Sequence, residues 1–441
     1  MNPKLFWNTL MIRMTSLQLL GLLLMVVSTT ACKTFAGQPV TIEIDTSQPA
    51  LVSQLQLGIT HTHMSTDHKD AVAAAVDRAI NAIKPVIKWQ NTHIIGWGPF
   101  DINPSPGVYK WETLDARFEH IKRFDAPNVI TLCTAPGWMK RKGKTWEMGD
   151  RPKAEHFDDF AMLSVEVAKR YPHVRHFQVW NEFKGFWNVK KNAWDVELYT
   201  EFYNKVYTAL KAHDPTLKVG GFYLVVSGTG SNRPGIETGK AILPKERRLF
   251  EYWIKHKVGA DFICVDKGIK DYHDKNQYTA DELLGYTDSY QRIGKQIHEM
   301  CDLPIWWAEY YGIGGEKQGI TQEQLTVAFA SIYNHMILGG NSVGLLWNPV
   351  QGEVAHALVT DVKTADGGQQ LPHTQLMGII NTCFGKGTSI YPITSTDSYV
   401  EALVSSSHAL LINKKNIPVT ITFNGKQVDI PAYAFELVSR N

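Results

Sequence analysis

The stretch HFQVWNEF, residues 176–183, is an apolar, strand-like run that ends in the carboxylate of Glu182. A second run of this kind, PIWWAEYYG at residues 304–312, places Glu309 behind two tryptophans. Barrel enzymes built from parallel strands display their functional groups at the carboxyl ends of those strands. The two stretches therefore predict strands of one α/β barrel whose carboxylates face a shared pocket.

Outward from these stretches, strand-like runs alternate with amphipathic segments along the chain. Residues 57–61 (LGITH) have the pattern of a first strand, and residues 71–83 that of its helix. The runs for the other strands are 92–98, 128–136, 176–182, 217–225, 260–266, 304–310 and 342–348. This order predicts a closed (β/α)8 TIM barrel. An open doubly wound sheet is disfavoured because no glycine-rich phosphate fingerprint follows the first strand.

The end of the chain has a different pattern, with short alternating runs separated by the turn signals Asn416-Ile417-Pro418 and Asn424-Gly425. Such runs predict antiparallel strands in a small β-sandwich module, which is too small to be stable alone. The run PVTIEID before the barrel is expected to add a strand to it. The predicted domains are a linker with this strand at 32–48, the catalytic barrel at 49–392 and the β-sandwich module at 393–441.

The first 31 residues have the pattern of a secretion signal peptide. Two basic residues precede an apolar run over 17–27, which is shorter than the roughly 20 residues that span a membrane. The ending STTAC resembles the bacterial lipoprotein signal, in which Cys32 is lipidated, and ordinary cleavage near Ala31 is the alternative. We therefore expect secretion across the inner membrane and a lipid anchor in the outer membrane or at the cell surface, or otherwise a periplasmic or extracellular protein.

Composition narrows the class of protein further. The 441 residues are 44% hydrophobic, enough for one large domain and a small module. Residues 1–31 hold two basic and no acidic side chains, so 45 − 2 = 43 basic residues face 43 acidic ones in the remainder. This balance does not indicate nucleic-acid binding. The cysteines after Cys32 are widely spaced and predict neither a zinc site nor a disulfide framework; they are Cys133, Cys264, Cys301 and Cys383.

Two carboxylates that face one pocket suit the cleavage of a glycosidic bond. Glu182 is the candidate general acid/base, because aromatic neighbours and a second carboxylate would keep it protonated. Asn181 beside it suits a hydrogen bond to the sugar hydroxyl next to the reacting carbon. Glu309 is the candidate nucleophile, and Tyr311 is placed to hydrogen-bond either this carboxylate or the sugar. The alternative for each glutamate is an ordinary surface residue at the end of a strand.

The pair WNEF and WWAEYYG resembles the acid/base and nucleophile strands of clan A retaining glycosidases. The segment from Phe160 to Gly221 is similar to glycoside hydrolase family 39, which includes β-xylosidases, α-L-iduronidases and bacterial exopolysaccharide glycosidases. The resemblance runs, with gaps, from the first strand to the C-terminal module. It implies a barrel with a β-sandwich, and retention of configuration through a covalent glycosyl-enzyme.

The chain departs from the family pattern at positions that concern the substrate. Phe183 follows the acid/base glutamate where the family usually has proline. Trp97-Gly98 stands where we expect the family's His-Gly, and Asp266 followed by Lys267 stands where it has histidine. We expect Asp266 and Lys267 to bind substrate, and the departures argue against a simple xylosidase.

Aromatic and histidine side chains are the other candidates for substrate contact. Trp97, Trp138 and Trp347 each end a predicted strand, where an aromatic face stacks on a pyranose, and packing is the alternative. We expect at least two of the three in the pocket. His61 and His63 form an HTH pair that suits sugar hydrogen bonding, with core packing as the alternative. A metal site at this pair is disfavoured because it requires histidines on the fifth and sixth strands and an aspartate on the eighth, and these strands supply no histidine and only the misplaced Asp266.

Basic residues follow several of the predicted strands and would lie at the active-site end. Solvated loop charges are the alternative, but a positive rim would attract a uronic-acid or other anionic glycan. These residues are Lys140, Arg141, Lys142, Lys144, Lys184, Lys190, Lys191, Lys267 and Lys270.

The sequence therefore predicts a retaining glycosidase that acts on an extracellular polysaccharide or oligosaccharide by double displacement. It implies no cofactor and no metal, a carbohydrate as the partner, and contact with the membrane only through a lipid anchor at Cys32. A non-catalytic glycan-binding surface lipoprotein is the main alternative, and a metal-dependent hydrolase is a weaker one.

Overall fold

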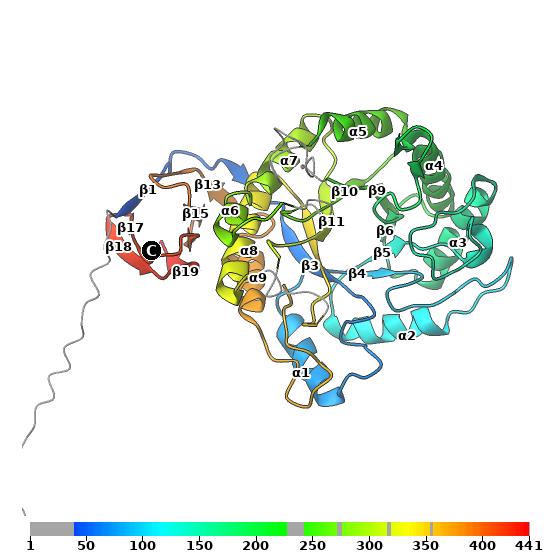
Figure 1. The fold of residues 1–441 in the computed structure, drawn as a ribbon, viewed down its shortest axis with the longest axis horizontal. Helices are drawn as coiled ribbons and strands as arrows, with labels where there is room; N and C mark the ends of the chain where they lie inside the picture. The colour runs from blue at the N-terminus through cyan, green and yellow to red at the C-terminus, as the bar shows by residue number, and fades with distance from the viewer. Residues whose placement is uncertain (1–38, 227–241, 271–275, 315–318, 353–355, 441) are drawn as a thin grey trace, which may run out of the picture. The chain divides into compact units, whose positions relative to one another are not determined.

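Eight parallel strands close into a barrel in the computed structural model (Figure 1). Neighbouring strands are β10, β11, β12, β3, β4, β5, β6 and β9, and β9 pairs again with β10. Their bounds in chain order are β3 (Gln56–Thr60), β4 (Trp89–His93), β5 (Asn128–Leu132), β6 (His176–Val179), β9 (Lys218–Val225), β10 (Phe262–Lys267), β11 (Ile305–Tyr310) and β12 (Val343–Trp347).

The structure describes residues 39–226, 242–270, 276–314, 319–352 and 356–440. The predicted signal peptide and Cys32 lie outside these ranges. Residues from Gly37 onward form a single unit. None of the helices in the described ranges has both the length and the apolar character needed to cross a membrane.

Helices connect the strands and surround the barrel (Figure 1). They are α1 (Ala73–Ile83), α2 (Glu112–Ile121), α3 (Phe157–Arg170), α4 (Val196–His213), α5 (Pro244–His256), α6 (Ala280–Leu284), α7 (Ser289–His298), α8 (Gln322–Leu338) and α9 (Pro372–Cys383). Short 3-10 turns lie at Lys122–Phe124, Gly137–Met139 and Ala154–His156. The alternation of strand and helix confirms the predicted (β/α)8 TIM barrel.

The second strand of the barrel was predicted wrongly. It was placed at residues 92–98, but β4 is the polar run WQNTH, which is buried except at Trp89. The amide side chains of Gln90 and Asn91 are tolerated there because they are hydrogen-bonded. Gln90 donates to the carbonyls of Ile121 and Ala126 at 3.1 and 2.8 Å. An apolar run is thus a poor guide to a strand whose barrel face is polar.

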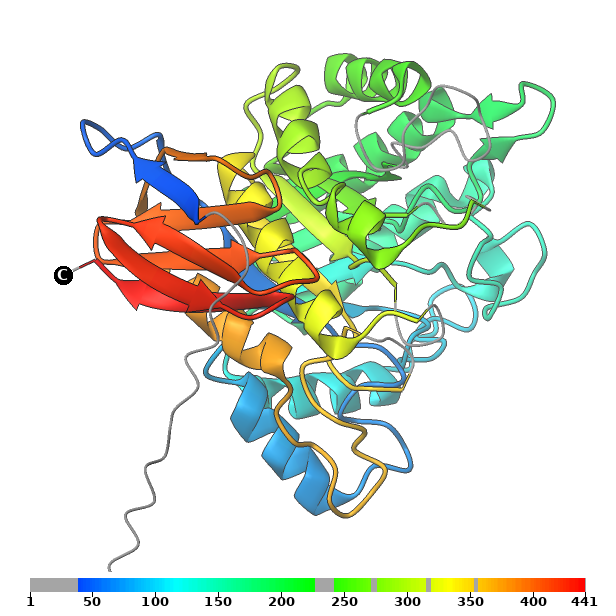
Figure 2. The same cartoon turned by 60° about the vertical axis from the view of Figure 1, so that its left-hand side comes forward.

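Two further sheets form a β-sandwich beyond the barrel (Figure 2). One has the order β14 (Ile393–Ser395), β1 (Val40–Ile44), β17 (Val419–Phe423) and β18 (Lys426–Ile430). The other has the order β19 (Ala434–Ser439), β16 (His408–Asn413), β15 (Val400–Ser405), β13 (Ser389–Tyr391) and β2 (Leu51–Val52). A separate apolar core, which includes Ile42, Val404 and Ile421, joins the two sheets. The N-terminal strands β1 and β2 therefore belong to a module that is otherwise C-terminal.

A buried ion pair links this module to the barrel. Glu401 of β15 pairs with Lys414 at 2.5 Å and with His335 of α8 at 3.2 Å. The Lys414 ammonium also donates to the carbonyl of Leu284 at 3.1 Å, at the end of α6. The two parts thus share polar groups that neither could satisfy alone.

Candidate active site

Three carboxyl groups meet at the carboxyl ends of the barrel strands. Oxygens of Glu182, Asp266 and Glu309 all lie within 4.8 Å of one another. Glu309 and Asp266 are 2% exposed, and the side chain of Glu182 is 18% exposed. The sequence predicted the two glutamates at this end of the barrel, whereas the third carboxyl was expected only as a substrate contact.

Backbone irregularities turn these carboxyls toward one another. In β11, the side chains of Trp306 and Ala308 belong to a core cluster of strand residues inside the barrel, so strict alternation would turn Glu309 outward. The register with β10 shifts at this point, so that Asp266 lies opposite Glu309. Such bulges commonly re-aim a side chain beside an active site.

The loop that carries Glu182 has an unusual backbone. Trp180, Glu182 and Phe183 all have left-handed φ angles, of 70°, 53° and 55°, which non-glycine residues seldom adopt. Trp180 donates its indole N–H to the carbonyl of Lys184 at 2.8 Å, and Phe183 stacks on Tyr199 of α4 at 4.1 Å between ring centroids. This aromatic anchoring holds a strained turn in place.

The aromatic side chains near Glu182 were expected to form a wall beside its carboxyl, and this expectation was wrong. Trp180 packs against Phe160 of α3 and Phe202 of α4, outside the barrel. Phe186 contacts Tyr199 in the same layer, and Trp187 is 44% exposed. These rings position the loop and leave the polar neighbours to control the carboxyl.

Glu309 is held by three hydrogen-bond donors. The hydroxyl of Tyr223 donates to Oε1 at 2.6 Å, and that of Tyr311 donates to Oε2 at 2.5 Å, which confirms the contact predicted for Tyr311. When the Asn181 amide is oriented to satisfy both of its polar atoms, its nitrogen lies 3.0 Å from Oε1. Burial, followed by the charge of Glu182, raises the pKa of Glu309 to about 7.

Glu182 has a different environment, because it forms an ion pair with Lys184. Burial is the largest effect on Glu182 and raises its pKa, but the charge of Lys184 and the hydrogen bonds with Asp266 and Lys184 together outweigh it, and the pKa lies below its ordinary value. Lys184 remains a cation, since the neighbouring glutamates outweigh its burial and raise its pKa. The free site therefore holds Glu182 ionised.

Asp266 hydrogen-bonds Glu182 and acts as the neutral member of the cluster. Burial, followed by the charges of Glu309 and Glu182, raises the pKa of Asp266 well above its ordinary value. A hard cation is the other group that three such oxygens can hold. In the described part of the chain, the ammonium of Lys184 already neutralises one of these three carboxyls, that of Glu182.

Two residues of the site were missed from the sequence. Tyr223 lies inside the apolar run 217–225 and gives no local signal. His93 ends β4, is fully buried, and contacts the rings of Trp97 at 4.4 Å and Trp347 at 5.8 Å. Placing the strand correctly would have put His93, instead of Trp97, at its end.

Of the three predicted tryptophans, Trp97 and Trp347 both contact the ring of His93 at the end of β4. Trp97 follows β4 with a left-handed φ of 48°, and the Lys184 ammonium lies 5.2 Å from the centroid of its ring. Trp347 ends β12 and meets Trp97 edge to face at 5.8 Å. Trp138 lies in a 3-10 turn, where it donates its N–H to the carbonyl of Asn103 at 3.0 Å and contacts His156.

The two histidines of the HTH segment have separate surroundings. His61 is fully buried, bonds Gln90 at 3.1 Å and packs edge-on against Phe124, so the expected sugar contact is replaced by core packing. Burial, followed by the charge of Arg117, lowers its pKa to about 3. His63 is exposed and lines a pocket of about 270 Å³ together with Trp97 and other residues, Phe100 and Trp146 among them.

The expected positive rim is largely neutralised by local contacts. Lys140 is buried and donates to the carbonyls of Thr145 and Glu147, whereas Arg141 pairs with Asp150 at 2.8 Å. Lys267 ends β10, is 1% exposed, and its ammonium lies 3.4 Å from the carbonyl of Val226. The other paired or bonded residues are Lys142 with Glu147, Lys191 with Asp195 and Glu197, and Lys270 with the carbonyl of Asn276.

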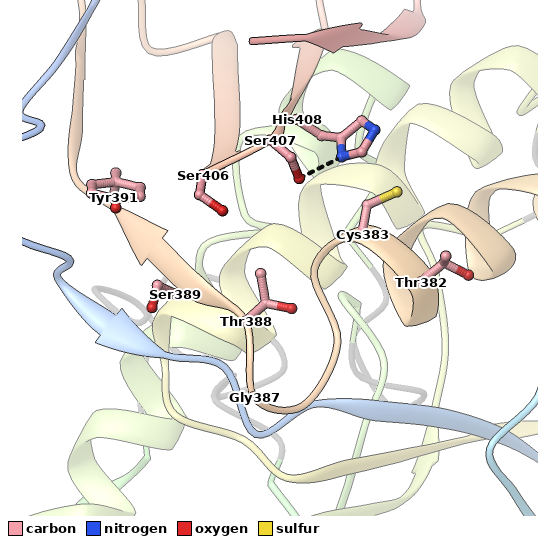
Figure 3. A pocket seen from close by; sticks show the side chains of 9 residues that line it. All are labelled: Thr382, Cys383, Gly387, Thr388, Ser389, Tyr391, Ser406, Ser407 and His408. Atoms are coloured by element: carbon pink, nitrogen blue, oxygen red, sulfur yellow. Dashed lines mark hydrogen bonds between the residues drawn. The ribbon is translucent and has the colours of Figure 1, made fainter. Parts of the chain in front are cut away.

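A separate groove of about 430 Å³ lies between the end of α9 and the turn that joins β15 to β16 (Figure 3). Its lining includes Cys383 and a hydrogen bond of 2.9 Å between Ser407 and His408. None of the three carboxyls lines it. The chemistry expected of the chain therefore belongs to the barrel end, not to this groove.

Comparison with solved structures shows the barrel fold. SrfJ from Salmonella typhimurium has a TM-score of 0.62 at 13% identity, over 89% of this chain and 93% of that one. The catalytic domain of the family 30 xylanase C from Talaromyces cellulolyticus has a TM-score of 0.58 at 13% identity, over 86% and 88%. A family 39 β-xylosidase from Caulobacter crescentus has 0.55 at 16% identity, over 86% and 82%.

Comparison of the sequence with protein families and with curated proteins gives one match, which covers part of the chain. No curated protein matches this chain. The stretch that carries Glu182, Asp266 and Glu309, residues 161–330, matches the family model of the glycosyl hydrolases family 39.

Proposed function

We propose that this protein is a retaining glycoside hydrolase that cleaves an extracellular polysaccharide or oligosaccharide by double displacement. The observation that carries the proposal is the approach of the Glu182 and Glu309 carboxyl oxygens to within 4.8 Å. Retaining enzymes hold their two carboxyls about 5–5.5 Å apart, whereas inverting enzymes leave about 6.5–9.5 Å for a water. The family match over residues 161–330 supports the same chemistry.

Glu309 is assigned as the nucleophile because hydrogen-bond donors orient both of its oxygens, which offsets part of the rise in its pKa to about 7. Three donors, from Tyr223, Tyr311 and Asn181, orient its two oxygens, and hydrogen bonds to a carboxylate favour the ionised form. One oxygen attacks the sugar carbon and forms a covalent bond as the bond to the leaving oxygen breaks. Asn181, Trp97, Trp347 and His63 are then placed to contact the sugar.

Glu182 is assigned as the general acid/base. In the first step it gives its proton to the leaving oxygen, and in the second it takes a proton from the water that attacks the glycosyl-enzyme. This role requires protonated Glu182 at the start, whereas Lys184 holds it ionised in the free site. Substrate binding must therefore change the surroundings of Glu182 before the first step.

The two roles are separated by single replacements assayed with an activated aryl glycoside. Glu309→Ala should abolish turnover, because no glycosyl-enzyme forms. Glu182→Ala should keep the first step, since this leaving group needs no proton, and azide should restore turnover as a glycosyl azide of retained configuration. Glu251→Ala, at an exposed position of α5, is the control. The assignment fails if neither site variant slows turnover by roughly 100-fold.

The alternatives give different results in the same experiment. A non-catalytic glycan-binding protein would bind glycans without turnover, and both alanine variants would keep that binding. A metal-dependent hydrolase would lose activity on treatment with a chelator. Product analysis on neutral and acidic glycans would distinguish β-xylosidase, α-L-iduronidase and exopolysaccharide glycosidase activities, and internal from terminal cleavage.

We also propose that the protein is secreted and anchored by a lipid at Cys32. The support is the basic, apolar and small-residue order of residues 1–32. Membrane partitioning of the full chain should be lost, or processing blocked, in Cys32→Ser. Equal partitioning of both forms would indicate ordinary signal cleavage.

A further inference from the structure

Lys184 lies beside the acid/base and next to Trp97. Its ammonium pairs with Glu182, donates to the oxygen of the Asn181 amide at 2.8 Å, and lies 5.2 Å from the centroid of the Trp97 ring. Its side chain is 32% exposed, so part of it is open to solvent. Trp97 also lines the 270 Å³ pocket, so Lys184 and this pocket have Trp97 as a common neighbour.

Among the described groups that shift the pKa of Glu182, Lys184 is the one that carries a positive charge. Asp266 from β10 and Glu309 from β11 face Glu182 as carboxyls, and Tyr223 from β9 faces Glu309. Cys133, which follows β5, is a neutral thiol because burial raises its pKa to about 12. The pairing with Lys184, together with the hydrogen bond with Asp266, therefore keeps the pKa of Glu182 below its ordinary value.

His93 of β4 is the remaining titratable group on this side of Lys184. Burial, with smaller contributions from the charges of Lys184 and Arg117, lowers the pKa of His93 to about 3 against a hydrogen bond with Asn181 that raises it, so this ring is neutral. It cannot replace the lysine as the counter-ion of Glu182. Removal of the lysine from Glu182 would thus leave that carboxyl beside other acids and without a cation.

We propose that Lys184 binds a carboxylate of the substrate, on a uronic-acid residue beside the cleaved bond, and that this exchange of partners frees Glu182 to act as the general acid. The inference rests on the proposed glycosidase function. The lysine leaves one carboxylate as it meets another, so the number of ion pairs is conserved. Glu182 then takes a proton from solvent and gives it to the leaving oxygen.

A neutral sugar would not make this exchange. A hydroxyl group is a weaker partner for an ammonium than a carboxylate is, because charge-assisted hydrogen bonds are roughly twice as strong as neutral ones. A neutral substrate therefore leaves Glu182 paired and slow to protonate the leaving group. Lys184 thus links recognition of an acidic sugar to the protonation of the catalytic group.

The test compares Lys184→Gln with Lys184→Arg, the variant that retains the charge. The substrates are pairs of disaccharides that differ only in a carboxylate or a hydroxymethyl group at C5 of one residue. The wild type and Lys184→Arg should prefer the acidic member by roughly 10- to 100-fold in kcat/KM, and Lys184→Gln should lose this preference. With the neutral member, the alkaline limb of kcat/KM should move to higher pH in Lys184→Gln, because Glu182 no longer has its cation.

Binding measured by calorimetry makes the inference independent of turnover. In a Glu309→Gln background, the acidic disaccharide should bind more tightly than the neutral one only while residue 184 is basic. If the Lys184→Gln variant keeps the preference and the alkaline limb, or if no acidic disaccharide binds better than its neutral partner, the inference about Lys184 is overturned. If binding follows the prediction but Glu182→Ala and Glu309→Ala leave turnover unaffected, the proposed glycosidase mechanism fails and the carboxylate site remains.

Discussion

Glu309→Gln should abolish activity and yet make the protein more stable at alkaline pH. Glu309 is 2% exposed, and burial together with the charge of Glu182 raises its pKa from 4.5 to about 7. Above pH 7 the folded state must hold this carboxyl ionised, although its surroundings favour the protonated form. A neutral glutamine of nearly the same shape removes the penalty and still accepts a hydrogen bond from Tyr223.

The magnitude follows from the difference between the two pKa values. The difference between 4.5 and about 7, at about 1.4 kcal/mol per pH unit, is on the order of 3 kcal/mol. A carboxyl whose pKa is raised on folding destabilises the folded state above its folded pKa and has no effect below its unfolded pKa. The gain from Glu309→Gln should therefore be near zero at pH 4.5, grow between pH 4.5 and 7, and stay constant above pH 7.

Urea unfolding followed by tryptophan fluorescence at pH 4.5, 6 and 8 measures this gain. Glu401→Gln is the matched control, because Glu401 is also buried but pairs with Lys414. Burial is the largest effect on Glu401 and raises its pKa, but the charges of Lys414 and His335 and the hydrogen bonds with both residues together outweigh it and hold the pKa well below its ordinary value. This control should destabilise the protein at neutral pH by about 3–5 kcal/mol, and the loss should shrink as the pH falls below 4.5. A Glu309→Gln variant that is less stable than the wild type at pH 8, or equally shifted at all three values, would refute the reasoning.

Three further replacements test other parts of the site. Tyr311→Phe removes a donor from Glu309, so the acidic limb of kcat/KM should move to higher pH and kcat/KM should fall roughly 10-fold; an unmoved limb would mean that this hydroxyl does not stabilise the anion. Arg117→Met should lower the free energy of unfolding by about 3–5 kcal/mol, because the buried guanidinium pairs with Asp67 at 2.6 Å and donates to the Trp97 carbonyl at 3.2 Å. Denaturant titrations measure this loss, and a loss below about 1 kcal/mol would contradict the prediction. His61→Gln should lower the unfolding midpoint and leave KM for a glycan within about twofold, since the ring packs in the core; a KM raised 10-fold would restore the predicted sugar contact.

The local pattern of apolar and polar residues was sufficient to predict the positions of most of the barrel strands. Seven of the eight predicted strand runs overlap the observed strands closely, and the strands of the C-terminal module follow the predicted alternation. The turn at Asn424 and Gly425 has the left-handed φ angles, 49° and 73°, that its sequence predicts for a two-residue hairpin. Burial of apolar side chains at period two or 3.6 determines these elements, and that periodicity can be read from neighbouring residues alone.

The same reasoning failed where polar side chains are buried. The run WQNTH forms β4 because Asn91 finds partners on the neighbouring strands β3 and β5 and Gln90 finds one just before β5, which no local pattern reveals. The correct end of that strand, and with it His93, was therefore missed. His61 was expected in the pocket, but its ring lies against Phe124, because the direction of a side chain just beyond a strand depends on the layer that packs over it.

The sequence by itself determined that Glu182 and Glu309 end strands of one parallel barrel, because apolar runs and their order along the chain carry that information. Only the tertiary structure decided that both carboxyls face inward. Strict alternation would turn the Glu309 side chain outward, and a register shift in β11 turns it inward instead. Left-handed backbone at Trp180 and Glu182 redirects the Glu182 carboxyl. The donation from Tyr223 to Glu309 likewise arises from closure of the barrel, because these distant residues contact one another only when β9, β10 and β11 lie side by side. The pairing of Lys184 with Glu182 is instead a local contact within the turn after β6.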